Sequence, residues 1–194
     1  MQESELILAC IKNDKAAQKQ FFETFYSKLA YTGLRYCKNA SQADDITIKG
    51  FSHVFSQLDQ FKAQNKQTLE EFVTHEFISF VVKHIKEIRN EYYVASTVRA
   101  VEHKEGSYDL FMDNGMIDLR NISQEVLLTS IQELVPSQRL VFNMHVIDNY
   151  PLASISELLE TSEQTIKSNL EKARFNLQKS IEKNLKLRNN EQPV

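Results

Sequence analysis

The chain has 194 residues, of which 42% are hydrophobic and 25% charged, a composition that excludes a wholly disordered protein and allows one domain or two small ones. Only 4 glycines and 3 prolines leave little material for the turns of β-sandwiches, barrels or phosphate-binding loops, so an all-α fold is expected. The net charge of -3 argues against a protein that coats nucleic acid nonspecifically, because such binding draws on many Lys and Arg residues.

Four helices are predicted in residues 1–90. Apolar residues recur at helical spacing after Ser4, which is a good helix N-cap, and again from Asp14, after Ser41 and after Thr68. Ser41 and Thr68 each precede a carboxylate by three residues, which is the spacing of a capping box. The four helices are expected to form one small domain.

Residues 91–121 form a different kind of segment. They contain two glycines, three basic and six acidic residues, and no sustained helical period. We interpret this segment as a flexible acidic linker. The chain is then expected to consist of a first domain at 1–90 and a second at 122–188, followed by a short disordered tail.

Further helices are predicted in the second domain. Ser123 precedes an apolar-periodic segment, and Pro136 suits the first turn of the next helix. A turn at 148–151 leads to a short helix at 152–160 and then to a long one that carries apolar residues to about Leu185.

The stretch from Pro151 to Arg174 has the proportions of a helix-turn-helix, whose second helix enters the DNA major groove. Side chains of the first turns of that helix are the candidates for reading bases, namely Glu163, Gln164, Lys167, Ser168 and Glu171. Basic residues nearby suit phosphates better, namely Arg139, Lys172 and Arg174. On spacing alone, a plain antiparallel helix pair with a solvated face is an equally good interpretation.

Other sites are not indicated. The five histidines have no metal-binding spacing, and no nucleophile elbow or glycine-rich loop is present, so we expect neither an enzyme nor a cofactor. Cys10 and Cys37 lie on apolar helix faces and are expected to be core thiols, with a redox pair as the alternative. An acidic start and the absence of a membrane-spanning run favour a cytoplasmic protein.

Two groups of motifs resemble bacterial sigma factors. In the second domain these are LVPSQRLVF at Leu134–Phe142, ISELL at Ile155–Leu159 and SEQTIKSNLEKAR at Ser162–Arg174, which resemble sigma region four. In the first domain, FFETFY at Phe21–Tyr26 and the segment from ADDI to FSHVF at Ala43–Phe55 resemble region two of the extracytoplasmic-function (ECF) group. The resemblance covers most of the chain outside the linker.

The resemblance implies partners and sites. Region four would bind the minus-35 promoter element through the residues named above. Region two would bind the coiled-coil clamp of core RNA polymerase through Asp44, Asp45, Thr47, Lys49, His53 and Gln57. Its last helix would read and open the minus-10 element through Lys83, His84, Lys86, Arg89 and Asn90. An anti-sigma factor is a further partner that the family suggests.

The chain also departs from the family pattern. Ile48, Lys49 and Gly50 stand where the family usually has a Gln-Glu pair before an apolar residue, and Glu160 replaces the customary turn glycine. The chain has no Trp, although one is common in the promoter-melting helix, and the start of that helix is acidic. We therefore predict a sigma factor that directs promoter-specific initiation, with a sigma-like module or regulator that does not melt promoters as the alternative, and a helical interaction adaptor ranked last.

Overall fold

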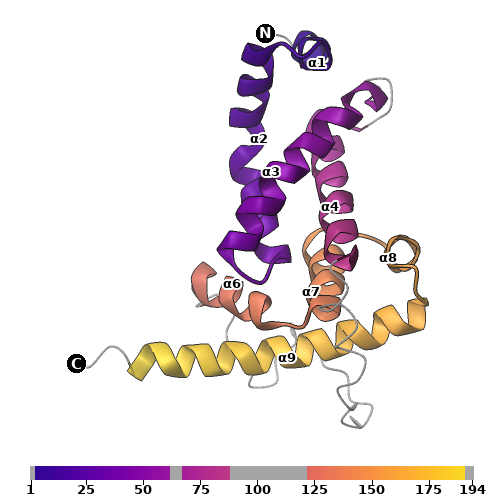
Figure 1. Cartoon of the computed structure of the whole chain (residues 1–194). Coiled ribbons are helices and arrows are strands. Elements are labelled where there is room, and N and C mark those ends of the chain that lie inside the picture. Colours follow the sequence, from indigo (N-terminus) through magenta and orange to yellow (C-terminus); the bar gives the residue numbers. More distant parts are fainter. Residues whose placement is uncertain (1–2, 62–66, 88–121, 191–194) are drawn as a thin grey trace. The chain divides into compact units, whose positions relative to one another are not determined.

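A computed structural model of the protein describes residues 3–61, 67–87 and 122–190. These residues contain helices and turns but no strands, and they divide into two compact units, Met1–His84 and Ile85–Val194, as expected for an all-α, two-domain fold. The predicted linker, 91–121, lies outside the described residues. In the order of Figure 1 the helices are α1 Glu3–Ile11, α2 Lys15–Tyr36, α3 Ala40–Gln57, the 3-10 turn η1 Leu58–Gln60, α4 Leu69–Glu87, α6 Gln124–Glu133, α7 Pro136–Phe142, the π-helical turn η4 Asn143–Ile147, α8 Leu152–Leu159 and α9 Glu163–Asn190.

An aromatic core joins α2 and α3 in the N-terminal unit. The ring of Phe21 lies 4.7 Å from that of Phe25 and 5.2 Å from that of Phe55, while Phe22 lies 4.5 Å from Phe51. Phe21 is completely buried, and full burial of such a side chain stabilises a fold by roughly 1.5–3 kcal/mol. The helical spacing of these phenylalanines in the sequence therefore does reflect core packing.

The helix starts follow from local side-chain chemistry. Ser123 accepts a hydrogen bond from Val126 N at 3.3 Å, so the predicted cap is confirmed, and Asp14 caps α2 by accepting one from Ala17 N at 2.8 Å. Thr68 and Glu71 form the predicted reciprocal capping box, with bonds of 2.8 and 3.2 Å between side chains and backbone N–H groups. These bonds, with Thr68 as the main partner, lower the pKa of the Glu71 carboxyl.

The predicted caps at Ser4 and Ser41 are wrong, because α1 already includes Glu3 and α3 already includes Ala40. Helix α3 begins at Ala40, and the capping side chain is Asn39, which accepts a hydrogen bond from Gln42 N at 2.9 Å. Asn and Ser are similarly good caps, so residue type alone does not tell which of two such residues, two positions apart, begins the helix.

A glycine lets α3 and α4 approach closely. A Cβ atom at Gly50 would lie 2.4 and 2.6 Å from two ring carbons of Phe77, and Phe77 is itself completely buried. Any larger residue at position 50 would collide with the neighbouring helix. Gly50 thus has a packing role that the family comparison of this position did not suggest.

The C-terminal unit is built around α9. In Figure 1 this long yellow helix lies along α6 and α7, and its buried apolar face consists of Ile166, Leu170, Ala173, Leu177 and Ile181. Glu133 at the end of α6 accepts hydrogen bonds from Ser180 and Lys183 of α9. The Ser180 bond is the main reason that the pKa of Glu133 is lowered.

Both cysteines are buried, and neither forms a disulfide. Burial, followed by the nearby Asp14 carboxylate, raises the pKa of the Cys10 thiol. The prediction of core thiols is confirmed. Among the described helices, none has the length and apolar character that a membrane span requires.

Candidate nucleic-acid interface

Helices α8 and α9 are joined by the tight turn that a helix-turn-helix requires. The turn residue Glu160 has φ 51° and ψ 46°, and its N–H donates back to Glu157 O at 3.2 Å. Ser162 then begins α9 by accepting a hydrogen bond from Thr165 N at 3.1 Å. Ile155 and Leu159 of α8 are buried, as are the apolar residues of the facing side of α9. The geometry places the opposite face of α9 in solvent.

The side chains predicted to read bases lie on this solvent-facing side. Glu163, Gln164, Lys167 and Glu171 are exposed, and Ser168 is half-buried. The set offers one cation, two carboxylates and one amide in the first turns of the helix, chemistry that reads guanine, cytosine and adenine edges respectively. Because the set has two carboxylates and only one cation, it does not itself attract DNA. Any electrostatic attraction to DNA must come from surrounding residues.

The two basic residues of α9 that are predicted to contact phosphates are less exposed than most of the residues predicted to read bases. Lys172 and Arg174 are both half-buried. The Nε atom of Arg174 is buried and has no hydrogen-bond partner, so one donor of this guanidinium is unsatisfied in the described structure.

Arg139 is not part of the DNA interface, and its predicted phosphate contact is corrected by the structure. Its side chain is only 2% exposed and donates from Nη1 to Gln132 O at 2.9 Å and Leu134 O at 2.8 Å. These carbonyls belong to the end of α6, where helical backbone acceptors lack partners. Arg139 therefore satisfies the α6 terminus from inside the core.

Replacing Glu160 by glycine is expected to stabilise the C-terminal unit by about 1 kcal/mol, because the left-handed conformation strains residues that carry a Cβ atom. Hydrogen exchange of α8 and α9 amides would measure the change. The matched control is Glu157→Gly within α8, which removes the same side chain from a helical position and should destabilise by a similar amount. If Glu160→Gly destabilised the unit as Glu157→Gly does, the strain argument would be refuted.

On α3 the predicted polymerase-binding residues divide into four groups. Asp44, Asp45 and Lys49 are exposed, with Lys49 Nζ 2.6 Å from Asp45 Oδ2. Thr47 is 3% exposed and donates to Ala43 O at 2.7 Å, so it faces α2 and its predicted place in the interface is wrong. Gln57, at the end of the helix, is half-buried.

The fourth group is His53, which the structure brings together with His84 from the predicted minus-10 set. The His53 ring stacks on Phe80 with centroids 5.3 Å apart, and His84 stacks on the same ring at 5.7 Å. His53 Nε2 also lies 3.4 Å from Glu76 Oε2. The sequence indicated two separate sites, whereas the three rings form one column between α3 and α4.

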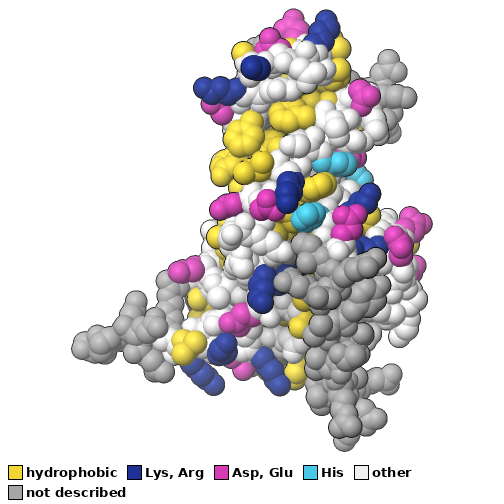
Figure 2. Space-filling view, in the orientation of Figure 1, with side chains coloured by type: hydrophobic (Ala, Val, Ile, Leu, Met, Phe, Trp, Pro, Cys, Tyr) yellow, Lys and Arg dark blue, Asp and Glu magenta, His cyan; other side chains and the backbone are white. Residues whose placement is uncertain are grey.

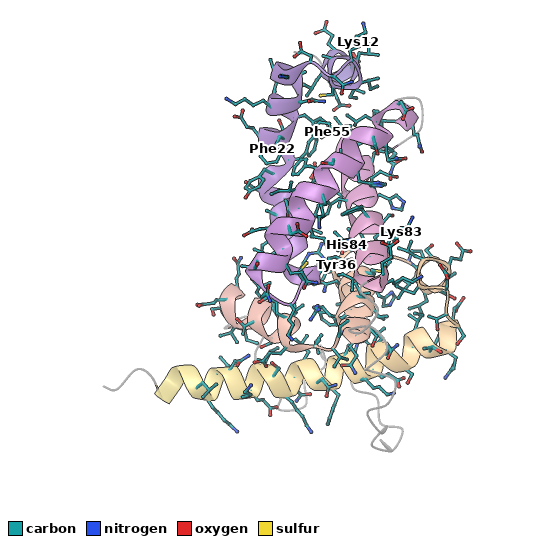
Figure 3. The ribbon with its side chains drawn as sticks, in the orientation of Figure 1. Lys12, Phe22, Tyr36, Phe55, Lys83 and His84 are labelled. Atoms are coloured by element: carbon teal, nitrogen blue, oxygen red, sulfur yellow. The ribbon has the colours of Figure 1, made fainter. Side chains whose placement is uncertain are left out.

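The remaining minus-10 candidates lie at the end of α4. Lys83 is exposed, as Figure 3 shows, and Lys86 is half-buried. Arg89 and Asn90 lie outside the described residues. The structure thus places two cations and His84 of this set within the last turns of the helix.

The acidic start of α4 has local structural roles. Lys28 Nζ lies 2.5 Å from Glu70 Oε1, Glu71 closes the capping box with Thr68, and Glu76 faces His53. Each carboxylate that set this helix apart from the family pattern therefore has a partner within the N-terminal unit.

Comparison with known proteins gives a match to a protein family and matches to solved structures. Residues 124–177 match the family "Sigma-70, region 4", a range that includes every residue predicted to contact the minus-35 element. The chain is also similar to the sigma factor RpoE of Bartonella quintana, solved in a co-crystal with the anti-sigma factor NepR, with a TM-score of 0.51 and 13% identity over 84% of this chain and 96% of that one. Among curated proteins, none matches this chain in sequence. The predicted resemblance of the second domain to sigma region four is confirmed by the family match, and the structural match shows a shared fold.

Proposed function

From the membership of residues 124–177 in the sigma-70 region 4 family, we propose that this chain is a sigma factor that binds core RNA polymerase and directs promoter-specific transcription initiation. The observation that carries the proposal is the helix-turn-helix of that segment, with a polar, solvent-facing side on the first turns of α9. In this assignment residues 122–188 bind the minus-35 element, and residues 1–90 bind polymerase and the minus-10 element.

The charge of the C-terminal region is compatible with a tethered DNA reader. Residues 122–194 hold eight basic and nine acidic residues, and Arg139 is buried, so the surface has no net attraction for DNA. A sigma factor needs little free-standing affinity, because its attachment to polymerase raises the effective concentration of the reading helix at the promoter.

Lys167 is expected to contribute directly to minus-35 binding. Lys167→Ala in the reconstituted holoenzyme should weaken binding about tenfold, since a good base contact is worth about 1–3 kcal/mol. Quantitative footprinting on a promoter fragment would measure it. Lys186→Ala is the matched control, because it removes the same charge from an exposed site about 28 Å further along the helix. Equal losses for both variants would indicate general electrostatics and contradict the placement of the reading face.

The proposed polymerase contact uses the exposed residues of α3. Asp44, Asp45 and Lys49 form its solvent-facing ridge, with His53 and Gln57 on the flank toward α4. The Bartonella quintana sigma factor was crystallised with an anti-sigma factor, which supports the proposal that such a protein also regulates this chain. We place the activity in the cytoplasm, where core polymerase works.

The alternative is a sigma-like module that binds polymerase or DNA without melting promoters. The absence of Trp favours it. The acidic start of α4 supports it less than the sequence suggested, because those carboxylates have local partners. Transcription from a premelted promoter, but not from a duplex one, would identify this alternative.

A further inference from the structure

A cavity lies where α1, α2, α3 and η1 of the N-terminal unit meet. Its volume is about 420 Å³, which is within the range of small-molecule sites in proteins. The apolar part of its wall consists of Ile11, Cys10 and Phe55 (Figure 3), and the Phe55 ring packs on that of Phe21 with centroids 5.2 Å apart. None of the described lining residues belongs to the proposed polymerase or DNA contacts, so the function assigned above does not account for this cavity.

Two serines of α3 present hydrogen-bond acceptors to the cavity. Ser52 donates its hydroxyl proton to Ile48 O at 3.3 Å, and Ser56 donates its own to His53 O at 2.6 Å. Ser56 also accepts a hydrogen bond from Gln57 Nε2 at 3.0 Å. A hydroxyl group has one proton and two lone pairs, so only lone pairs remain for a bound molecule. The serine side of the cavity therefore favours a ligand that donates hydrogen bonds.

Asp59 of η1 makes the lining of the cavity negative. In the part of the chain that the structure describes, its carboxylate has no ion pair or hydrogen bond. The remaining polar lining residues are Asn13 and Gln18, which carry no charge. Gln18 Nε2 donates to Asn13 Oδ1 at 3.4 Å, which leaves Gln18 Oε1 as a further acceptor. Figure 2 shows acidic and basic side chains mixed around α1 at the top of the view, so a preference for ligands of one charge must come from the lining itself.

We propose that this cavity binds a small organic ammonium compound, whose N–H groups donate to Asp59 and to the serine hydroxyls while its hydrocarbon part packs against Ile11 and Phe55. An ammonium group has three donors and no acceptor, which complements a lining of one carboxylate and several lone pairs. An anionic ligand would be repelled by the same carboxylate. The inference is independent of the proposed function. Because the lining comes from four elements, a bound amine would hold α1 against η1 and stabilise the folded unit by mass action.

Calorimetric titration of the full-length chain with 2-phenylethylamine tests the preference for a cation. The matched probes are 2-phenylethanol and 3-phenylpropanoate, which keep the aromatic body but replace the ammonium group by a neutral hydroxyl or by an anion. The amine should bind about fivefold more tightly than the alcohol at low salt, as for an exposed ion pair, and the anion should bind most weakly. The difference between amine and alcohol should shrink as salt is added.

Three variants locate the site. Asp59→Asn should weaken binding of the amine about fivefold and leave binding of the alcohol unchanged, because it removes only the charge. Asp44→Asn is the matched control, since it removes the same charge from an exposed position of α3 that does not line the cavity. Ser52→Phe should abolish binding of both probes by filling the cavity. Circular dichroism confirms that each variant is folded.

Cys10 provides a second readout at the cavity itself. Its thiol lines the cavity, so saturating 2-phenylethylamine should slow its alkylation by iodoacetamide severalfold, as measured by mass spectrometry of the labelled peptide. Cys37 is the internal control, because it is also buried but does not line the cavity. Its alkylation rate should change less than that of Cys10.

The expected result is saturable binding of the amine that Asp59→Asn weakens and Asp44→Asn does not. The inference is overturned if 2-phenylethylamine does not bind, or if it binds no more tightly than 3-phenylpropanoate. Equal slowing of alkylation at both cysteines would place the bound amine elsewhere and would also overturn it. None of these outcomes bears on the proposed function, which is tested by binding to core polymerase.

Discussion

Gly50→Ala is expected to destabilise the N-terminal unit by about 2 kcal/mol or more. The added Cβ would lie 2.4 Å from a ring carbon of Phe77, and overpacking of a tight core costs about 1–3 kcal/mol. The better helix propensity of alanine offsets about 1 kcal/mol of this, and the severity of the clash places the net result toward destabilisation. Hydrogen exchange of amides in α3 and α4 measures the free energy of opening for this unit separately.

Two variants sharpen this test. Ser52→Ala, on the exposed side of α3, raises helix propensity without a clash and should leave the unit as stable or slightly more so. Adding Phe77→Leu to Gly50→Ala removes ring atoms at the collision site, so the double variant should lose less stability than the sum of the singles. Strict additivity would show that the two positions do not touch and would contradict the packing.

Arg139→Met is expected to destabilise the C-terminal unit by about 3 kcal/mol. The substitution keeps the apolar stem but removes the donors to Gln132 O and Leu134 O, and each buried carbonyl left without a donor costs about 1–3 kcal/mol. Exchange of amides in α6 and α7 would report the loss.

A crossed comparison separates the structural role of Arg139 from a DNA contact. Lys167→Ala is expected to change stability by no more than about 0.5 kcal/mol while weakening DNA binding. Arg139→Met should lower stability and leave DNA binding unchanged, measured under conditions where the unit remains folded. If Arg139→Met were fully stable but bound DNA more weakly, the result would indicate that Arg139 contacts DNA after all.

The sequence was most informative where the interaction is local. Caps such as Ser123 and the Thr68–Glu71 box depend on residues three positions apart, so residue type and spacing suffice to predict them. Thr47 was wrongly predicted to be exposed, although the sequence spacing indicates burial. Thr47 precedes Val54 by seven residues and therefore shares its buried helix face.

Other features depend on contacts between distant segments. A sequence shows that Arg139 is charged but not that its guanidinium reaches the end of the preceding helix, since buried arginines are rare and a basic residue near a helix-turn-helix is expected at a phosphate. The role of Gly50 and the ring column of His53, Phe80 and His84 depend on how α4 packs on α3. The exposure of Ile48 likewise follows from the packing on both flanks of α3.

The central claim is tested most directly by reconstituting the full chain with core RNA polymerase from its source bacterium and measuring run-off transcription on a pool of genomic promoter fragments. The account predicts a stable complex in gel filtration and discrete transcripts that require the chain. A complex that produces no transcripts from duplex promoters would contradict promoter-directed initiation, and failure to bind a competent core polymerase would contradict the sigma-factor assignment itself.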